Sequence, residues 1–397
     1  MGRFCRLPFN GLELSPDGTC QVCCKIDRPI LKPDGTKFNL VHDQLIDIWN
    51  SEDLQNLRAQ FQKGEEPEIC SKCWVEESTG NFSLRQQTKD LAYNEKNPKP
   101  SYISLKLSNK CNLACRICGP HLSSLWEQEF LKTNKDTGFP EYFRHVHDDK
   151  LIGKNLELFH KWAPRFEHVL IYGGEPLIND EVLNFLDHCA DSGIARHIHL
   201  VLNTNGTMCS DRLISKLSQF KKVSLFLSID DFGSRFEYQR WPARWDKVSL
   251  NLERFCSLGA PFDVRLYPTF SLLNIYYLEE ILNELSRFVV PINILNIIHE
   301  PAILALRNAP SLMKDLVKRR LSSIDFSRYH LDGEHDYKSI LINTIDLPAD
   351  SKFADIKEWY RAFNWQIGSS DEYRGQHFSE IFPELSKIFA MDIRSTV

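Results

Sequence analysis

The sequence lacks long hydrophobic runs and has no excess of basic charge. No stretch reaches the roughly 18 uncharged apolar residues that a membrane helix needs. The most apolar region, 289–306, is interrupted by Pro291, Asn293 and Glu300. Lys and Arg number 48 against 53 Asp and Glu, which gives a net charge of -5. We therefore expect no membrane partner and no nucleic-acid partner, since anionic membranes and nucleic acids both favour a basic face.

Targeting signals, internal repeats and low-complexity segments are also missing from the sequence. The first ten residues, MGRFCRLPFN, do not contain the apolar run of a signal peptide. We therefore expect a cytoplasmic, reducing location, where disulfides are rare. The twelve cysteines of the chain are hard to explain as disulfides in that compartment, and their clustering indicates metal binding.

The cysteines fall into two groups, which predicts two metal sites. Six lie between Cys5 and Cys73, and three lie between Cys111 and Cys118. Between the groups runs a polar segment rich in Lys, Asn and Pro, which is typical of a linker. We predict four regions, namely an N-terminal iron–sulfur module at 1–85, a linker at 86–100, a barrel at 101–300 and a helical C-terminal extension at 301–397.

The region after the linker alternates between β-branched runs and segments with helical spacing of apolar residues. This pattern predicts an α/β fold with parallel strands. About six β/α units indicate a partial, TIM-like (β/α)6 barrel instead of a closed eight-stranded one. The predicted strands are 102–108, 168–174, 197–205, 223–230, 263–271 and 292–298.

The two flanking regions have different patterns. PDG turns at 16–18 and 33–35 predict a small β-hairpin region near the N-terminus. A helix is expected over 51–64, with Ser51 as its N-cap. The C-terminal extension is predicted to be helical, with helices that include 311–321 and 355–365.

Cys111, Cys115 and Cys118 form a CxxxCxxC motif in the loop that leaves the first predicted barrel strand. A four-iron cubane takes four ligands, and this motif supplies three thiolates. The open iron can then bind the amino and carboxylate groups of S-adenosylmethionine (SAM). A zinc site or a chance cluster of cysteines remains an alternative at this point.

Small and polar residues at the ends of the next three predicted strands are candidates for cofactor binding. Because the carboxyl ends of parallel barrel strands share one edge, they gather around one site. The two glycines would let backbone groups approach a ligand, and the carboxylate could receive an ammonium group. Each side chain is also compatible with ordinary turn or ion-pair chemistry. The candidates are Gly173, Gly174, Glu175, Asn203, Asn205, Ser228, Asp230 and Arg240.

From Tyr102 to about Pro301 the chain resembles the radical SAM superfamily. The resemblance rests on CNLACRIC and on the GGE triplet at 173–175. It implies a [4Fe–4S] cluster on Cys111, Cys115 and Cys118, and reductive cleavage of SAM to a 5′-deoxyadenosyl radical. One position departs from the family pattern, since Ile117 stands where an aromatic residue is usual.

The N-terminal cysteines resemble the signature of SPASM and twitch domains, which hold auxiliary [4Fe–4S] clusters. Twelve residues separate Cys5 from Gly18, four more separate Gly18 from Cys23, and Cys70 and Cys73 form a CxxC pair. The resemblance implies an auxiliary cluster on these four cysteines, although such domains usually follow the barrel. Cys20 and Cys24 remain alternatives to Cys23, and a structural zinc site remains an alternative to iron.

Together these features predict a radical SAM enzyme that abstracts hydrogen from a substrate, with the auxiliary cluster assisting oxidation. The substrate is expected to be a small molecule or a peptide. The electron donor is expected to be a reducing protein such as flavodoxin or ferredoxin. Two alternatives remain, namely a maturase that modifies ribosomal peptides and a non-catalytic iron–sulfur or zinc protein that relays electrons or binds a partner.

Overall fold

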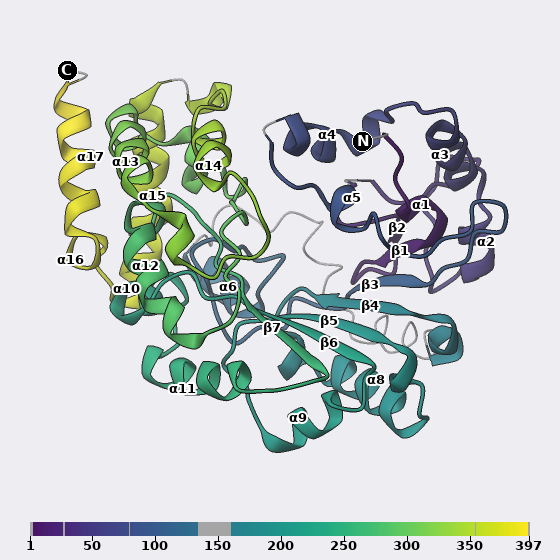
Figure 1. Cartoon of the computed structure of the whole chain (residues 1–397). Coiled ribbons are helices and arrows are strands. Elements are labelled where there is room, and N and C mark those ends of the chain that lie inside the picture. Colours follow the sequence, from purple (N-terminus) through teal and green to yellow (C-terminus); the bar gives the residue numbers. More distant parts are fainter. Residues whose placement is uncertain (1–2, 27, 79, 134–159, 354, 396–397) are drawn as a thin grey trace.

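A seven-stranded sheet forms the centre of the chain (Figure 1). The computed structural model describes residues 3–26, 28–78, 80–133, 160–353 and 355–395. The strands lie in the order β2-β1-β3-β4-β5-β6-β7. All neighbours are parallel except β1 and β2, which pair antiparallel. The strands are β1 (Gly11–Leu14), β2 (Cys20–Gln21), β3 (Tyr102–Lys106), β4 (His168–Tyr172), β5 (His199–Thr204), β6 (Lys222–Leu227) and β7 (Phe262–Leu266).

The two faces of the sheet differ in polarity because side chains alternate along each strand. On β5, Leu200 and Leu202 are fully buried, whereas His199, Val201 and Asn203 on the other face are only partly buried. The apolar face packs on helices that lie on one side of the sheet in Figure 1. These helices are α8 (Asp180–Asp191), α9 (Asp211–Leu217) and α11 (Trp245–Cys256). The other face is polar and lines a cavity.

The remaining helices belong to the barrel's upper loops and to the two flanking regions. In the barrel they are α6 (Ser124–Thr133), α10 (Gly233–Gln239) and α12 (Leu278–Leu285). The N-terminal region holds α1 (Leu7–Asn10), α2 (Leu45–Trp49), α3 (Glu52–Gln62), α4 (Ser71–Ser78) and α5 (Leu84–Gln87). The C-terminal region holds α13 (Ser311–Ser323), α14 (Tyr337–Ile345), α15 (Ile356–Arg374), α16 (Phe378–Ile381) and α17 (Pro383–Ser395). None of the helices that the structure describes is long and apolar enough to cross a membrane.

The sheet extends across the predicted boundary between the N-terminal module and the barrel. Residues 11–14 of β1 pair in parallel with residues 102–105 of β3. The linker also packs on the module, since the Trp49 indole donates to the Pro98 carbonyl at 3.0 Å and Asn10 donates to Ala92 at 2.9 Å. The module and the barrel therefore share one sheet, and the fourfold division of the chain stays a prediction.

Five of the six predicted barrel strands form, and the α/β partial barrel is confirmed. The prediction of a sixth strand at 292–298 is wrong. This segment makes only isolated parallel bridges, Leu266 with Ile292 and Phe270 with Ile297. Pro291 has no N–H to donate, and the Asn293 side chain accepts from Leu295 N at 3.0 Å, so local bonds replace a regular ladder. The sixth parallel strand is β1.

Local signals in the flanking regions agree with the structure. Ser51 caps α3 by accepting from Leu54 N, as predicted. Gly18 has φ +81°, consistent with the first PDG turn between β1 and β2. In Figure 1 the C-terminal helices and the N-terminal module both stand above the sheet, the helices at the left and the module at the right.

Candidate functional site

Cys111, Cys115 and Cys118 lie together in the loop that follows β3. Cys115 is buried, and the other two are partly buried. The thiols of Cys115 and Cys118 hydrogen-bond to each other, which lowers the pKa of Cys115 and raises that of Cys118. Burial, and next the neighbouring Cys115, raise the pKa of Cys111 to about 12. The structure thus brings together the three cysteines that the motif predicted.

Gly173 and Gly174 bring the turn after β4 directly against the cysteine loop. Both have positive φ, +87° and +59°. A Cβ on Gly174 would lie 2.4 Å from the Lys110 carbonyl oxygen, and Glu175 N donates to that same oxygen at 2.8 Å. The glycines therefore allow a close approach of backbone to backbone, which holds the cysteine loop in place.

Glu175 joins the ends of β4 and β5 from a buried position. Its carboxylate accepts from the Thr204 hydroxyl at 2.7 Å, from Asn205 N at 2.7 Å and from Leu177 N at 3.1 Å. Burial raises the pKa of this carboxyl, while these donors favour its charged form. Its binding of a ligand ammonium group stays a prediction, because the observed partners are all protein groups.

Asn203 and Asn205 point to different parts of the site. Asn205 donates to Asn112 Oδ1 at 2.9 Å and so ties the end of β5 to the cysteine loop. Asn203 lines the cavity on the polar face of the sheet. Its Oδ1 atom is buried and has no hydrogen-bond partner among the described residues. This unpaired acceptor is available to a ligand.

Asp230 and Arg240 form a buried ion pair beside Cys115. Arg240 donates through Nε and Nη2 to the two Asp230 oxygens at 2.8 and 2.9 Å. Its third nitrogen, Nη1, lies 3.9 Å from Cys115 Sγ. Burial opposes the charge of Arg240, but Asp230 and next Cys115 keep its pKa raised. Ser228 lies two residues before Asp230, is partly buried, and donates its backbone N–H to Thr204 O at 2.9 Å.

These residues fit a [4Fe–4S] cluster with three protein thiolates. No three His, Cys, Asp or Glu side chains in the described ranges converge as a single metal ion requires. A cubane is wider than one ion, so its thiolates stand around it instead of meeting at a point. The buried Arg240 guanidinium supplies positive charge beside thiolates that carry negative charge.

The cysteines of the N-terminal module form a second group. Burial, and next the neighbouring Cys70 and Cys73, raise the pKa of Cys5 to about 12. Burial likewise raises the pKa of Cys23, with added contributions from Cys24 and Cys5. Four cysteines from three segments of the chain are therefore close enough to act on one another, which fits the predicted auxiliary cluster.

Cys20 and Cys24 differ in their relation to this group. Apart from burial, the groups that raise the pKa of the fully buried Cys20 are Asp17 and Asp43, and its Sγ lies 4.0 Å from Gly18 O. Cys24 is exposed, neighbours Cys23, and lines the central cavity. Of the two spare cysteines, only Cys24 therefore lies with the group in the described structure.

Arginines beside both cysteine groups were missed from the sequence. Arg85 donates to Glu77 and to the Phe4 carbonyl, and its charge acts on Cys5 and Cys73. Arg116 stands inside the CxxxCxxC motif and donates to Asp371 at 2.5 Å and to Gln376 at 2.9 Å. The position of Arg116 between two motif cysteines was the one feature of the sequence that could have indicated its role. Its hydrogen-bond partners lie about 250 residues away in the chain.

A cavity of about 640 Å³ lies on the polar face of the sheet and borders Cys24 of the N-terminal module. Cys24 and Glu76 reach it from the module, His199 and Asn203 from the strands, and His335 from the C-terminal region. His199 Nε2 lies 2.9 Å from Ser224 Oγ, and burial, and next His168, lower the pKa of His199 to about 4. The charged side chains in its wall pair with one another, as in Lys25–Glu76, Lys222–Asp263 and Arg265–Asp332.

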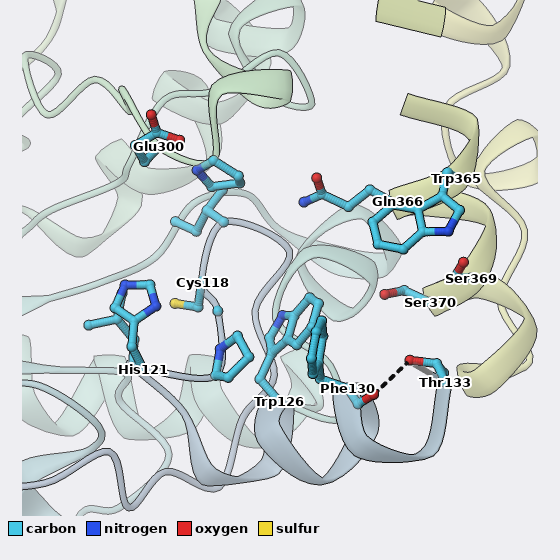
Figure 2. Close-up of a pocket in the computed structure, with 15 residues that line it drawn as sticks. Cys118, His121, Trp126, Phe130, Thr133, Glu300, Trp365, Gln366, Ser369 and Ser370 are labelled. Atoms are coloured by element: carbon cyan, nitrogen blue, oxygen red, sulfur yellow. Dashed lines mark hydrogen bonds between the residues drawn. The ribbon is translucent and has the colours of Figure 1, made fainter. Parts of the chain in front are cut away.

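A second cavity, of about 520 Å³, borders Cys118 (Figure 2). Figure 2 shows Trp126 and Phe130 from α6 on one side and Trp365 and Gln366 from α15 on the other. Its wall combines aromatic and aliphatic side chains with polar ones such as His121, Glu300 and Gln366.

The comparisons with known proteins agree with this geometry. Residues 105–286 match the model of the radical SAM superfamily, and residues 5–74 match SPASM, an iron–sulfur cluster-binding domain. Over 156 residues the chain is 26% identical to 7-carboxy-7-deazaguanine synthase of Halobacterium salinarum. This aligned region covers 39% of this chain and 51% of that protein. Over 194 residues the chain is 25% identical to an uncharacterised protein of Methanocaldococcus jannaschii. This aligned region covers 48% of this chain and 59% of that protein. The chain thus spans about half the length of the curated relatives it matches.

Similar solved structures have low identity to this chain. SuiB of Streptococcus suis bound to S-adenosylmethionine superposes with a TM-score of 0.36 and 16% identity, over 71% of this chain and 54% of that one. TYW1 with a lysine-pyruvate adduct superposes with a TM-score of 0.30 and 13% identity, over 53% of this chain and 70% of that one.

Proposed function

Because the chain is a radical SAM superfamily member with an N-terminal SPASM-type iron–sulfur module, we propose that it cleaves SAM reductively and abstracts hydrogen from a substrate. The observation that carries this proposal is the grouping of Cys111, Cys115 and Cys118 at the carboxyl ends of the strands. The GGE turn and the end of β5 are tied directly to that loop. A loop that only held a structural metal would not need these two attachments.

The proposed roles of the residues follow from their contacts. Cys111, Cys115 and Cys118 would hold a [4Fe–4S] cluster. When bound, this cluster and SAM supply an electron transfer that cleaves SAM to methionine and a 5′-deoxyadenosyl radical. Gly173 and Gly174 let the turn after β4 pack directly against the cysteine loop, and their proposed role is to form the part of the site that binds the amino end of SAM. The Asp230–Arg240 pair holds positive charge at Cys115.

The second cysteine group is proposed to hold the auxiliary [4Fe–4S] cluster, with Cys5, Cys23, Cys70 and Cys73 as its ligands. Cys24 stays an alternative to Cys23, and it reaches the central cavity. A redox group at this wall would be well placed to accept an electron from a substrate in the cavity. Zinc in the same four positions would have no such role.

We place the substrate in the 640 Å³ cavity, whose volume suits a small molecule or one side chain of a peptide. Its permanent charges are already paired, so it offers mainly neutral hydrogen-bonding groups. Asn203 Oδ1 in particular is a buried acceptor that lacks a donor. A substrate with hydroxyl, amide or amine donors would satisfy this atom, whereas an apolar one would leave it unpaired at a cost of about 1–3 kcal/mol.

The direct test is SAM cleavage by anaerobically reconstituted protein with dithionite. We expect 5′-deoxyadenosine and methionine from the wild type and none from the Cys115→Ala variant. Cys209→Ala is the matched control, since Cys209 lies outside both groups. Deuterium transfer from candidate substrates to 5′-deoxyadenosine would then separate small molecules from peptides. A protein that contains only zinc, or a Cys115→Ala variant that still cleaves SAM, would contradict the proposal.

A further inference from the structure

Arg374, the last residue of α15, is buried with part of its guanidinium unpaired. Its side chain is 0% exposed, and Nε donates to Glu129 Oε2 at 2.8 Å. Ser370, one turn earlier on α15, donates to the other Glu129 oxygen at 2.7 Å. Nη1 and Nη2 of Arg374 are buried and have no hydrogen-bond partner in the described part of the chain. Leaving a buried charged donor unsatisfied costs more than leaving a neutral one unsatisfied, so an acceptor is expected here.

The position of Arg374 is fixed against the loop that carries Cys115. Its guanidinium lies 5.3 Å from the centre of the Trp241 ring. The Trp241 carbonyl accepts a hydrogen bond from the backbone N–H of Ala114 at 2.7 Å. Ala114 directly precedes Cys115 in the chain. One turn before Arg374 on the same helix, Asp371 accepts from Arg116, directly after Cys115. The helix face that bears Arg374 is therefore attached to both sides of Cys115.

A negatively charged acceptor on the side of Cys115 would satisfy these two nitrogens. Glu129, the partner of Arg374, is already bonded through both of its oxygens. Arg116 repels Arg374, whereas Cys115 attracts it. The ring of Trp241 attracts the guanidinium face but does not accept its in-plane N–H groups.

We propose that Nη1 and Nη2 of Arg374 donate hydrogen bonds to sulfur atoms of a [4Fe–4S] cluster on Cys111, Cys115 and Cys118, and thereby raise its reduction potential. This inference rests on the proposed function, because it requires the cluster at these cysteines. Arg240 differs in having two of its three nitrogens bonded to Asp230. Arg374 keeps two nitrogens free for the cluster.

The physical consequence concerns the reduced state. Reduction adds one negative charge to the cluster, and N–H donors on a positive group stabilise that charge more than they stabilise the oxidised state. An arginine more than 250 residues from the motif would then make the cluster easier to reduce. The C-terminal extension would be part of the redox site as well as a packing element.

The test is an EPR-monitored redox titration of the reconstituted protein, following the cluster signal that changes when SAM is added. In Arg374→Met, we expect the ratio of reduced to oxidised cluster, measured at the wild-type midpoint, to fall about tenfold. A tenfold change corresponds to about 59 mV for one electron. Glu129→Gln removes a negative charge and should shift the ratio in the opposite direction. Arg361→Met, on the exposed side of α15, should leave it unchanged.

Opposite changes of the reduced-to-oxidised ratio in Arg374→Met and Glu129→Gln separate an electrostatic role of Arg374 from a structural one. Loss of packing would change the ratio in the same direction in both variants. Shifts in the same direction, or an unchanged midpoint in Arg374→Met, would overturn the inference. If that variant loses its cluster, Arg374→Lys keeps the charge with fewer donors and should show a smaller fall; an unchanged ratio there also overturns it. A wild type without any SAM-responsive signal would instead refute the proposed function.

Discussion

Single buried residues hold the two strand-end turns and the cysteine loop in one arrangement. Glu175 links the ends of β4 and β5, and Gly174 permits contact between the GGE turn and Lys110. Asp230 keeps Arg240 at Cys115. Each of these groups acts on protein neighbours at distances given by the structure, so their contributions can be measured without a substrate.

Gly174→Ala should destabilise the fold and loosen the cysteine loop. The added Cβ would lie 2.4 Å from the Lys110 oxygen, and φ +59° is unfavourable for alanine. We expect a loss of at least about 2 kcal/mol in the free energy of unfolding, measured by urea titration. Gly368→Ala is the matched control, because its Cβ would meet no atom within 4 Å inside helix α15. That control should be neutral or stabilising by up to about 1 kcal/mol, and equal effects of the two changes would contradict the account.

His199 should make stability depend on pH. Its folded pKa of about 4 lies below the ordinary value of 6.5, because burial and His168 oppose the charged ring. Between these two values the unfolded chain binds a proton that the folded chain does not, so the contribution is present above pH 6.5 and is lost as pH falls toward 4. His199→Gln should remove at most about 1.4 kcal/mol per pH unit from this slope. Urea titrations from pH 4.5 to 7 check this, with the exposed His197→Gln as control; a slope unaffected by His199→Gln would refute it.

At the residue scale the sequence predicted the residues that belong to motifs, but it did not predict the hydrogen-bond partners of buried side chains. Cys111, Cys115 and Cys118, together with GGE, are recognisable from their spacing alone. Asn203 was predicted as a cofactor-binding residue, but its unpaired acceptor and the buried donors of Arg374 are not recognisable from the sequence, because each depends on side chains from distant parts of the chain. Arg240 was predicted as a site residue, but its bond to Asp230 was not predicted.

At the scale of elements, the pairing of β1 with β3 matters most for the architecture. The alternation of apolar residues predicted five barrel strands, since each buries one full face under helices. The parallel pairing of 11–14 with 102–105 joins segments about 90 residues apart, and four residues of GLEL carry too little pattern to predict it. The failure at 292–298 has the opposite cause, because an apolar run there lies next to Pro291 and contains Asn293.

Shared sheet structure predicts that the module and the barrel unfold together. A chain truncated to begin at Ser101 would lack β1 and expose the edge of β3, whose Ile103 and Leu105 are fully buried in the whole chain. We expect the truncated chain to aggregate, and the full chain to show one calorimetric transition for module and barrel. A soluble truncated chain with native-like circular dichroism, or two separate transitions, would contradict this prediction.

At the scale of the whole molecule, one cavity on the polar face of the sheet reaches the N-terminal cysteine group through Cys24. Cys24 borders it on the module side, and Asn203 borders it near the strand ends that adjoin the SAM site. The cavity walls come from all three parts of the chain. Under the proposed function, a substrate in this cavity would pass an electron to the auxiliary cluster on the module side.

Two clusters with separate ligands make separate contributions to the iron content. Reconstituted wild-type protein should contain about eight irons, four at each site. Cys70→Ala/Cys73→Ala and Cys115→Ala/Cys118→Ala should each retain about four. Iron and sulfide analysis checks this, and zinc in place of four irons would show that the module is a structural zinc site.

The most direct test of the central claim is the yield of 5′-deoxyadenosine from these same proteins with SAM and dithionite. The account predicts that the auxiliary-site variant Cys70→Ala/Cys73→Ala still forms 5′-deoxyadenosine, whereas Cys115→Ala/Cys118→Ala forms none. Cleavage that persists without Cys115 and Cys118, or that is absent from a wild type with both clusters in place, would contradict it.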